Sequence, residues 1–307
     1  MTTATTPLRG IVTALVTPLH PDGRIDTEGL KALVDVQIGS GVHAVFPLGT
    51  TGEVSYLTTA QRVDVVGTVI EHVAGRVPVV AGVVEMSAAR AIDEVRALAE
   101  LRPDYLVATP PVYGDGTDGE VVAHFERIAA SADAPLIAYD IPFKTHRKLT
   151  AGIVRQLVKD QTIVAVKDSS GDFRTFRGLV TELADSPVAL LTGTEQMVDV
   201  SVMMGASGAV LGLANVDPRG FVEVYDAAVA GDWERARTAQ ERLVRLVQIM
   251  DVGVGFGLSF DSSIFGALKH VLASDGIIAS AQISSGTPLP AEAAARIDEI
   301  VQRSRQS

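Results

Sequence analysis

A lysine at the end of an apolar run is the clearest candidate for chemistry in this sequence. The apolar residues 163–166 lead directly into Lys167, and a Ser-Ser-Gly turn follows at residues 169–171. This pattern predicts a buried strand that places an amine at its carboxyl end. Lysines usually avoid such places, because burying an ammonium without a partner costs free energy. The alternative is a strand that reaches the surface one residue early and leaves Lys167 in solvent.

Tyr139 is the second candidate, because it lies in an otherwise apolar strand candidate. With alternating side chains, Ile137, Tyr139 and Ile141 share one face, and Ala165 shares a face with Lys167. We therefore expect Tyr139 and Lys167 to meet on neighbouring strands. A phenol beside a desolvated amine suits proton transfer. The alternative is a core aromatic whose hydroxyl bonds to the backbone.

The Gly-Thr-Thr-Gly turn at residues 49–52 suits the binding of a carboxylate. Thr50 and Thr51 offer hydroxyls and consecutive N–H groups, and Gly49 lets the backbone approach a ligand closely. An ordinary turn between a strand and a helix is the alternative, since glycine and threonine are common there.

The elements that must position these residues alternate regularly along the chain. Short apolar runs predict strands at 11–18, 44–49, 79–84, 105–110, 136–142, 163–169, 188–194 and 208–213. Amphipathic runs between them predict helices at 26–40, 58–74, 87–100, 119–131, 150–159, 173–184, 195–204 and from 217 onward. Eight such units predict an α/β fold of the (β/α)₈ TIM barrel type. A doubly wound sheet is the structural alternative.

The last part of the sequence shows helical patterns alone. We expect a barrel over residues 1–230 and a C-terminal helical extension over 231–307, with helices at 233–252, 262–274 and 290–303. The glycine-rich stretch 252–257 is expected to be a joint inside the extension.

Two further strand ends carry candidates for substrate binding. Tyr113 follows the fourth strand, and Gly193 lies at the end of the seventh. The active sites of barrel enzymes lie at the carboxyl ends of the strands, so both residues are grouped with Lys167.

Composition excludes several classes of partner. The chain of 307 residues has a net charge of −11, no cysteine and no basic tract, so we expect no nucleic-acid partner. No apolar run approaches 18 residues, and the threonine-rich start lacks the apolar core of a signal peptide, so we expect no membrane partner and a cytoplasmic location. The histidines show no metal-binding spacing, so no metal is expected, and His72 and His124 are expected at the surface.

Four motifs, in this order, resemble one known family. They are Gly-Thr-Thr-Gly-Glu at 49–53, Tyr-Asp-Ile-Pro at 139–142, Val-Lys-Asp-Ser-Ser-Gly-Asp at 166–172 and Gly-Ala-Ser-Gly-Ala-Val at 205–210. The sequence resembles the dihydrodipicolinate synthase / N-acetylneuraminate lyase family of class I aldolases. The resemblance implies a barrel, a Schiff base between a lysine and pyruvate or another 2-oxo acid, an aldehyde as second substrate, no cofactor, and a homo-oligomer, either a dimer or a tetramer built from dimers.

The resemblance also implies roles for individual residues. Lys167 would form the Schiff base, and Tyr139 would shuttle protons. Thr50 and Thr51 would hold the pyruvate carboxylate and relay protons, and the backbone carbonyl of Val210 would line the pyruvate site. Burial of the amine favours its neutral, nucleophilic form.

Three positions depart from the pattern of the synthases in this family. Lys144 stands where synthases have an arginine that binds the aldehyde's carboxylate, so the bidentate fork is lost. The relay tyrosine of the synthases aligns with Val112, and Tyr113 is one residue displaced. Asp140 replaces the usual asparagine. These departures weaken the synthase assignment more than the Schiff-base assignment.

The leading interpretation is a Schiff-base-forming, pyruvate-dependent lyase similar to dihydrodipicolinate synthase, which condenses pyruvate with aspartate semialdehyde. The alternative is a 2-keto-3-deoxy sugar acid aldolase or dehydratase, or an enzyme similar to N-acetylneuraminate lyase. A non-catalytic 2-oxo acid binding protein is the remaining hypothesis.

Overall fold

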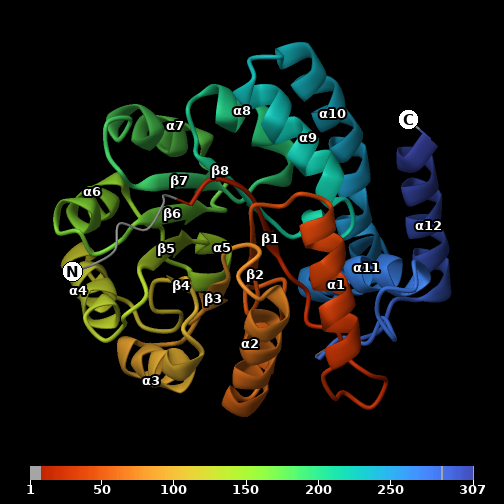
Figure 1. Ribbon diagram of the computed structural model, residues 1–307, viewed down its shortest axis with the longest axis horizontal. Coiled ribbons are helices and arrows are strands. Elements are labelled where there is room, and N and C mark those ends of the chain that lie inside the picture. The colour runs from red at the N-terminus through yellow and green to blue at the C-terminus, as the bar shows by residue number, and fades with distance from the viewer. Residues whose placement is uncertain (1–7, 285, 307) are drawn as a thin grey trace.

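The fold is a closed barrel of eight parallel strands surrounded by helices (Figure 1). The computed structural model describes residues 8–284 and 286–306. The strands are hydrogen-bonded in the order β2-β1-β8-β7-β6-β5-β4-β3. The two ends of this series meet through one parallel bridge between Val45 and Val79. The predicted (β/α)₈ TIM barrel is therefore confirmed.

The strands are shorter than predicted, because each ends before the polar loop that follows it. They are β1 Gly10–Ala14, β2 Ala44–Phe46, β3 Val80–Gly82, β4 Tyr105–Ala108, β5 Leu136–Asp140, β6 Ala165–Asp168, β7 Ala189–Thr192 and β8 Gly208–Leu211.

The barrel helices follow the strands in the predicted order, and side-chain caps begin most of them. They are α1 Thr27–Gly39, α2 Thr59–Val73, α3 Ala88–Leu98, α4 Asp118–Ala129, α5 Pro142–Thr145, α6 Ala151–Lys159, α7 Phe173–Glu182, α8 Val198–Met203 and α9 Pro218–Val229. Short 3₁₀ turns occur at η1 Val54–Tyr56, η2 Ala99–Leu101, η3 Glu195–Met197 and η4 Leu213–Asn215. The four-residue α5 was not predicted.

The extension consists of α10 Trp233–Leu246, η5 Val247–Phe256, α11 Phe260–Ser274 and α12 Ala291–Gln306. The predicted helix 233–252 is wrong at its end, because the α-helix stops at Leu246 and continues as the 3₁₀ helix η5. Three glycines in the predicted joint 252–257 favour this change, since glycine is a poor α-helix former. Figure 1 shows α10 and α12 side by side at one flank of the barrel.

Side chains alternate between two buried layers, as the strand period requires. One layer fills the barrel and includes Phe46, Ile137, Tyr139 and Ala165. The other lies between the strands and the helices. Leucines and isoleucines of the extension belong to this outer layer as well. Among the described residues, none of the helices has the length and apolar character needed to cross a bilayer.

Candidate active site

A cavity of about 340 Å³ opens at the carboxyl ends of the strands. Seven of the nine predicted site residues line it, namely Thr50, Thr51, Tyr139, Lys144, Lys167, Gly193 and Val210. The cavity also receives residues of α11 and η5, so the extension forms part of its wall.

Lys167 and Tyr139 lie next to each other on paired strands. Their Cα atoms are register partners between β5 and β6. The Lys167 side chain is buried, and its Nζ atom lies 3.9 Å from the centroid of the Tyr139 ring and 5.2 Å from that of Phe46. Two aromatic faces partly compensate an ammonium for the loss of water. The Lys167 amine therefore lies against two aromatic rings and forms part of the cavity lining.

The turn after β2 lines the cavity with Thr50 and Thr51, whose backbone N–H groups have no acceptor among the described residues. The Gly49 and Thr50 carbonyls accept hydrogen bonds from the N–H groups of Gly52 and Glu53, both at 3.0 Å. Consecutive unpaired N–H groups can hold an anion such as a carboxylate.

The same turn requires unusual backbone conformations. Leu48 has a φ of 61°, in the left-handed region that residues other than glycine seldom adopt. A Cβ atom on Gly82 would lie 2.0 Å from the Leu48 carbonyl oxygen, so only glycine fits at that position on β3. Gly49 itself does not line the cavity, and its contribution is to the turn.

Glu195 adds a carboxylate that was not predicted as a site residue. It lines the cavity, and its Oε1 atom accepts a hydrogen bond of 3.1 Å from the Gly212 N–H. Burial raises the pKa of the Glu195 carboxyl, while backbone N–H groups and the charge of Lys167 act in the opposite direction. A carboxyl group in the same cavity as the amine can exchange protons with a bound substrate.

An ion pair crosses the cavity from α5 to α11. The Nζ atom of Lys144 lies 2.5 Å from the Asp261 Oδ1 atom, and both side chains are partly exposed. Beside it, the rings of Phe143 and Phe260 meet edge to face, with centroids 6.4 Å apart. A second space of about 240 Å³ shares the Lys144 and Asp261 walls.

Besides Gly49, two predicted placements differ from the structure. Tyr113 is 87% exposed on the loop after β4 and does not line the cavity, whereas Val112 lines the second space. His124 was expected at the surface, but it is buried, and its Nε2 atom lies 3.0 Å from the Thr109 carbonyl oxygen. The helix α4 turns this position toward the barrel. Burial lowers the pKa of His124, which favours a neutral ring.

Asp261 and Glu195 are the site residues that sequence reasoning missed. Glu195 ends the motif after the seventh strand, and its position at a strand end was the available signal. No signal identified Asp261, because it comes from an extension whose packing the sequence pattern did not define. Within the described part of the chain, no group of three or more metal-binding side chains is placed to hold an ion.

Comparisons with known proteins agree over nearly the whole chain. A model of the Dihydrodipicolinate synthetase family matches residues 7–283. A 4-hydroxy-tetrahydrodipicolinate synthase of Laribacter hongkongensis is 35% identical over 236 residues, which are 77% of this chain and 81% of the relative.

Two solved structures share both the fold and detectable sequence identity. A dihydrodipicolinate synthase of Bacteroides thetaiotaomicron has a TM-score of 0.90 and 29% identity, and the match covers 97% of this chain and 99% of the other. A chloride-inhibited dihydrodipicolinate synthase of Acinetobacter baumannii, complexed with pyruvate, has a TM-score of 0.88 and 27% identity, with the same two coverages.

Proposed function

The chain belongs to the dihydrodipicolinate synthetase family, whose members are class I aldolase-type lyases, and we propose that it forms a Schiff base between Lys167 and pyruvate. The observation that carries this proposal is the buried Lys167 amine on the Tyr139 ring, in a cavity that is also lined by Thr50 and Thr51. The N–H groups of these two threonines have no acceptor among the described residues and are available for a carboxylate.

The proposed reaction begins with the pyruvate carboxylate on the N–H groups of Thr50 and Thr51. The neutral Lys167 amine attacks the C2 carbonyl, and the resulting carbinolamine loses water to give an iminium ion. The iminium draws electrons from C3, which then loses a proton to give an enamine. The enamine carbon forms a bond to the aldehyde carbon, whose oxygen takes up a proton, and water finally releases the product and the amine. Tyr139 is the proposed carrier of these protons.

Reductive trapping tests the Schiff base directly. The protein is incubated with pyruvate, reduced with borohydride, digested and analysed by mass spectrometry. We expect a pyruvate-derived adduct on Lys167, and none in Lys167→Met. Lys159→Met, which removes an exposed lysine on α6, is the matched control and is expected to trap normally. Absence of an adduct on Lys167 would refute the Schiff base and favour a non-catalytic 2-oxo acid binding protein.

For the second substrate, the first candidate is aspartate semialdehyde, as in a dihydrodipicolinate synthase. Relatives at 31–35% identity that are named 4-hydroxy-tetrahydrodipicolinate synthase support this candidate. In this role Lys144 would bind the carboxylate of the aldehyde.

The ion pair at Lys144 favours a second candidate, an enzyme that cleaves or dehydrates 2-keto-3-deoxy sugar acids. Among the described residues, the cations that line the cavity are Lys144 and Lys167, and Asp261 already neutralises the first. Carboxylates also line the cavity at Glu195 and Asp251. Carboxylates accept hydrogen bonds from hydroxyl groups and repel a second carboxylate, so this end of the cavity suits an uncharged, hydroxylated aldehyde.

A substrate comparison separates the two candidates. Condensation of pyruvate with aspartate semialdehyde is measured beside the cleavage of several keto-deoxy sugar acids. Asp261→Asn frees Lys144 and is expected to lower the KM for a carboxylated aldehyde about 10-fold, because a charged hydrogen bond becomes available. Activity toward sugar acids alone would exclude the synthase candidate. An unchanged KM in Asp261→Asn would show that Asp261 does not prevent Lys144 from binding a carboxylated aldehyde.

Assembly and location belong to the same proposal. We propose a homo-oligomer, a dimer or a tetramer, in which the exposed Tyr113 contacts a second copy, and a cytoplasmic enzyme. The 87% exposure of Tyr113 leaves its ring available for such a contact, and tyrosine is enriched at protein interfaces. Sedimentation of the wild type and of Tyr113→Ala measures the oligomeric state of each. A monomeric wild-type protein would contradict the proposed homo-oligomer.

A further inference from the structure

Two buried aspartates, bridged by a partly exposed lysine, lie directly behind the candidate catalytic pair. Asp140 follows Tyr139 on β5, and Asp168 follows Lys167 on β6. Side chains alternate along a strand, so both aspartates point away from the cavity, toward the helices. They are register partners, and they are 1% and 5% exposed.

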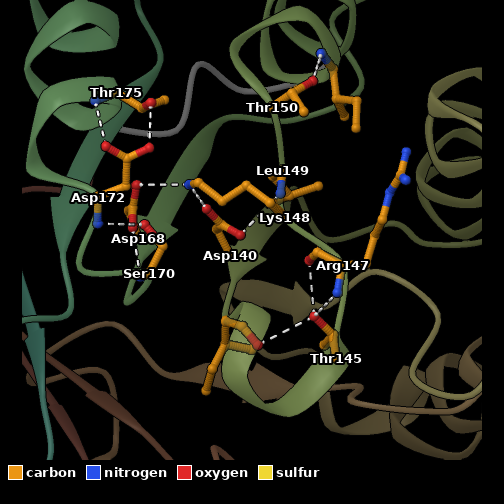
Figure 2. A network of polar contacts seen from close by, with 12 residues as sticks. Asp140, Thr145, Arg147, Lys148, Leu149, Thr150, Asp168, Ser170, Asp172 and Thr175 are labelled. Atoms are coloured by element: carbon orange, nitrogen blue, oxygen red, sulfur yellow. Dashed lines mark hydrogen bonds and ion pairs between the residues drawn. The ribbon is translucent and has the colours of Figure 1, made fainter.

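Lys148, in the loop between α5 and α6, is the cation that joins the two aspartates (Figure 2). Its Nζ atom forms an ion pair with the Asp140 Oδ2 atom and lies 3.5 Å from the Asp168 Oδ2 atom. The other oxygen of Asp140 accepts a hydrogen bond of 3.0 Å from the Leu149 N–H. Two consecutive residues of one loop therefore fix the end of β5.

The Asp168 carboxylate fixes the turn that follows β6. Its Oδ1 atom accepts a 2.7 Å hydrogen bond from the Ser170 N–H, and the Ser170 hydroxyl accepts one of 3.1 Å from the Asp172 N–H. Asp172 in turn caps α7. Ser169 and Ser170 line the cavity, so this group connects the strand end, the cavity wall and a helix start.

We propose that Lys148 is a positioning residue for the Tyr139–Lys167 pair, because it balances the two carboxylates that lie one residue beyond them. Neighbouring strands are about 4.8 Å apart, and two carboxylates at that spacing repel each other unless a cation lies between them. Displacing the strand ends would move the amine and the phenol together with them. This inference rests on the proposed Schiff-base function, since it concerns how fast that Schiff base forms.

The first test measures the rate constant of Schiff-base trapping in Lys148→Met. We expect the rate constant and kcat to fall by about 10- to 100-fold, because small displacements of reacting groups have effects of that size. The KM for pyruvate is expected to change less than about 2-fold, because the proposed carboxylate site lies on the turn after β2. A purely structural role would lower the folded fraction but not the rate constant per folded site. Lys159→Met is the matched control and is expected to behave as the wild type.

The second test uses a double-mutant cycle with Asp140→Asn. This substitution removes one of the two carboxylates, so Lys148 has one charge fewer to balance. We expect the fold-decrease in the trapping rate constant caused by Lys148→Met to be at least about 3-fold smaller in the Asp140→Asn background than in the wild type. The double variant also carries less unbalanced charge, so it remains informative if Lys148→Met alone fails to fold, which thermal unfolding reveals.

The outcomes are distinguishable. A wild-type protein that traps no pyruvate refutes the proposed function itself. If the wild type traps pyruvate and Lys148→Met traps it at the same rate, Lys148 has no positioning role. If Lys148→Met lowers the trapping rate constant by the same factor in both backgrounds, Lys148 does not act by balancing the two carboxylates.

Discussion

The carboxyl of Asp140, buried at the end of β5, links the protonation of one residue to the stability of the fold. Burial raises its pKa from 3.8 to about 6; Lys148 and the Leu149 N–H oppose this shift, and Asp168 adds to it. Because the pKa is higher in the folded state than in the unfolded state, the folded state binds more protons between about pH 4 and 6. The contribution of Asp140 to stability is therefore greatest at low pH and is lost as the pH rises through 6.

The corresponding prediction concerns Asp140→Asn, which cannot ionise. Relative to the wild type, this variant is expected to gain free energy of unfolding as the pH rises from 4 to above 6, by on the order of 2–3 kcal/mol. Urea denaturation of both proteins at pH 4.5, 5.5 and 7.5 measures the difference. A difference that stays constant over this range, or that shrinks as the pH rises, would contradict the prediction.

Side-chain alternation predicted which residues share the cavity at the level of β5 and β6. Tyr139 and Lys167 were expected on one face of adjacent strands, and their register confirms that placement. The same alternation puts Asp140 and Asp168 on the opposite face, but Lys148 lies in a loop, whose direction has no periodic signal. Asp261 is further away in the sequence, and its contact with Lys144 depends on how a helix packs.

Among the elements, the turn after β2 is tied to the C-terminal helix α11. Lys269 on α11 is fully buried; its Nζ atom donates to the Gln282 carbonyl at 2.8 Å and forms an ion pair with the Glu53 Oε1 atom. The Glu53 Oε2 atom accepts a 2.6 Å hydrogen bond from the Ser284 N–H. Burial lowers the pKa of Lys269, and the neighbouring Glu53 opposes that shift. The extension therefore holds the turn that carries Thr50 and Thr51.

Breaking this ion pair is expected to destabilise the fold. Lys269→Met leaves the Glu53 carboxylate buried without its cation and is predicted to lower the free energy of unfolding by about 3–5 kcal/mol. Adding Glu53→Gln removes the unpaired charge, so the double variant is expected to regain part of the loss. Equilibrium unfolding in urea measures both. A double variant less stable than Lys269→Met would show that the charge is not what destabilises the single variant.

The start of an element was easier to predict from sequence than its end. Polar caps such as Thr58, Ser87 and Thr150 precede α2, α3 and α6, and each accepts a hydrogen bond from the first turn of its helix. The end of α10 was missed, because apolar residues continue at helical spacing beyond Leu246. The geometry that replaces the α-helix there depends on contacts with α11, which a local pattern does not contain.

At the scale of the whole molecule, barrel and extension share one apolar core. Leu243, Leu246, Ile249 and Leu268 of the extension belong to the same buried cluster as the outer face of the strands. The alternation of short apolar runs with amphipathic runs in the sequence was sufficient to predict eight strand–helix units followed by a helical extension. It did not reveal that the extension would contribute Asp261 and Phe265 to the cavity.

The division of the chain at residue 230 remains a prediction, and the shared core suggests how to test it. A segment of residues 1–230 would expose the apolar surface that α10 and α11 cover. We therefore expect this segment not to unfold cooperatively, whereas the full chain does so in one transition. Thermal unfolding followed by circular dichroism compares the two. A cooperative transition in the isolated segment would mean that the barrel folds independently.

The contact between β2 and β3 closes the barrel with few hydrogen bonds. The single bridge at Val45 and Val79 includes the bond from the Val45 N–H to the Pro78 carbonyl, at 3.1 Å. A further bond, from the Gly82 N–H to the Pro47 carbonyl, measures 3.3 Å. Local opening of a protein begins where the fewest bonds must break. The amide hydrogens along this contact are therefore expected to exchange with solvent early. The turn with Thr50 and Thr51 directly follows β2, so a ligand bound to this turn would slow the local opening of the contact between β2 and β3. Slower amide exchange along this contact would therefore report that substrate is bound.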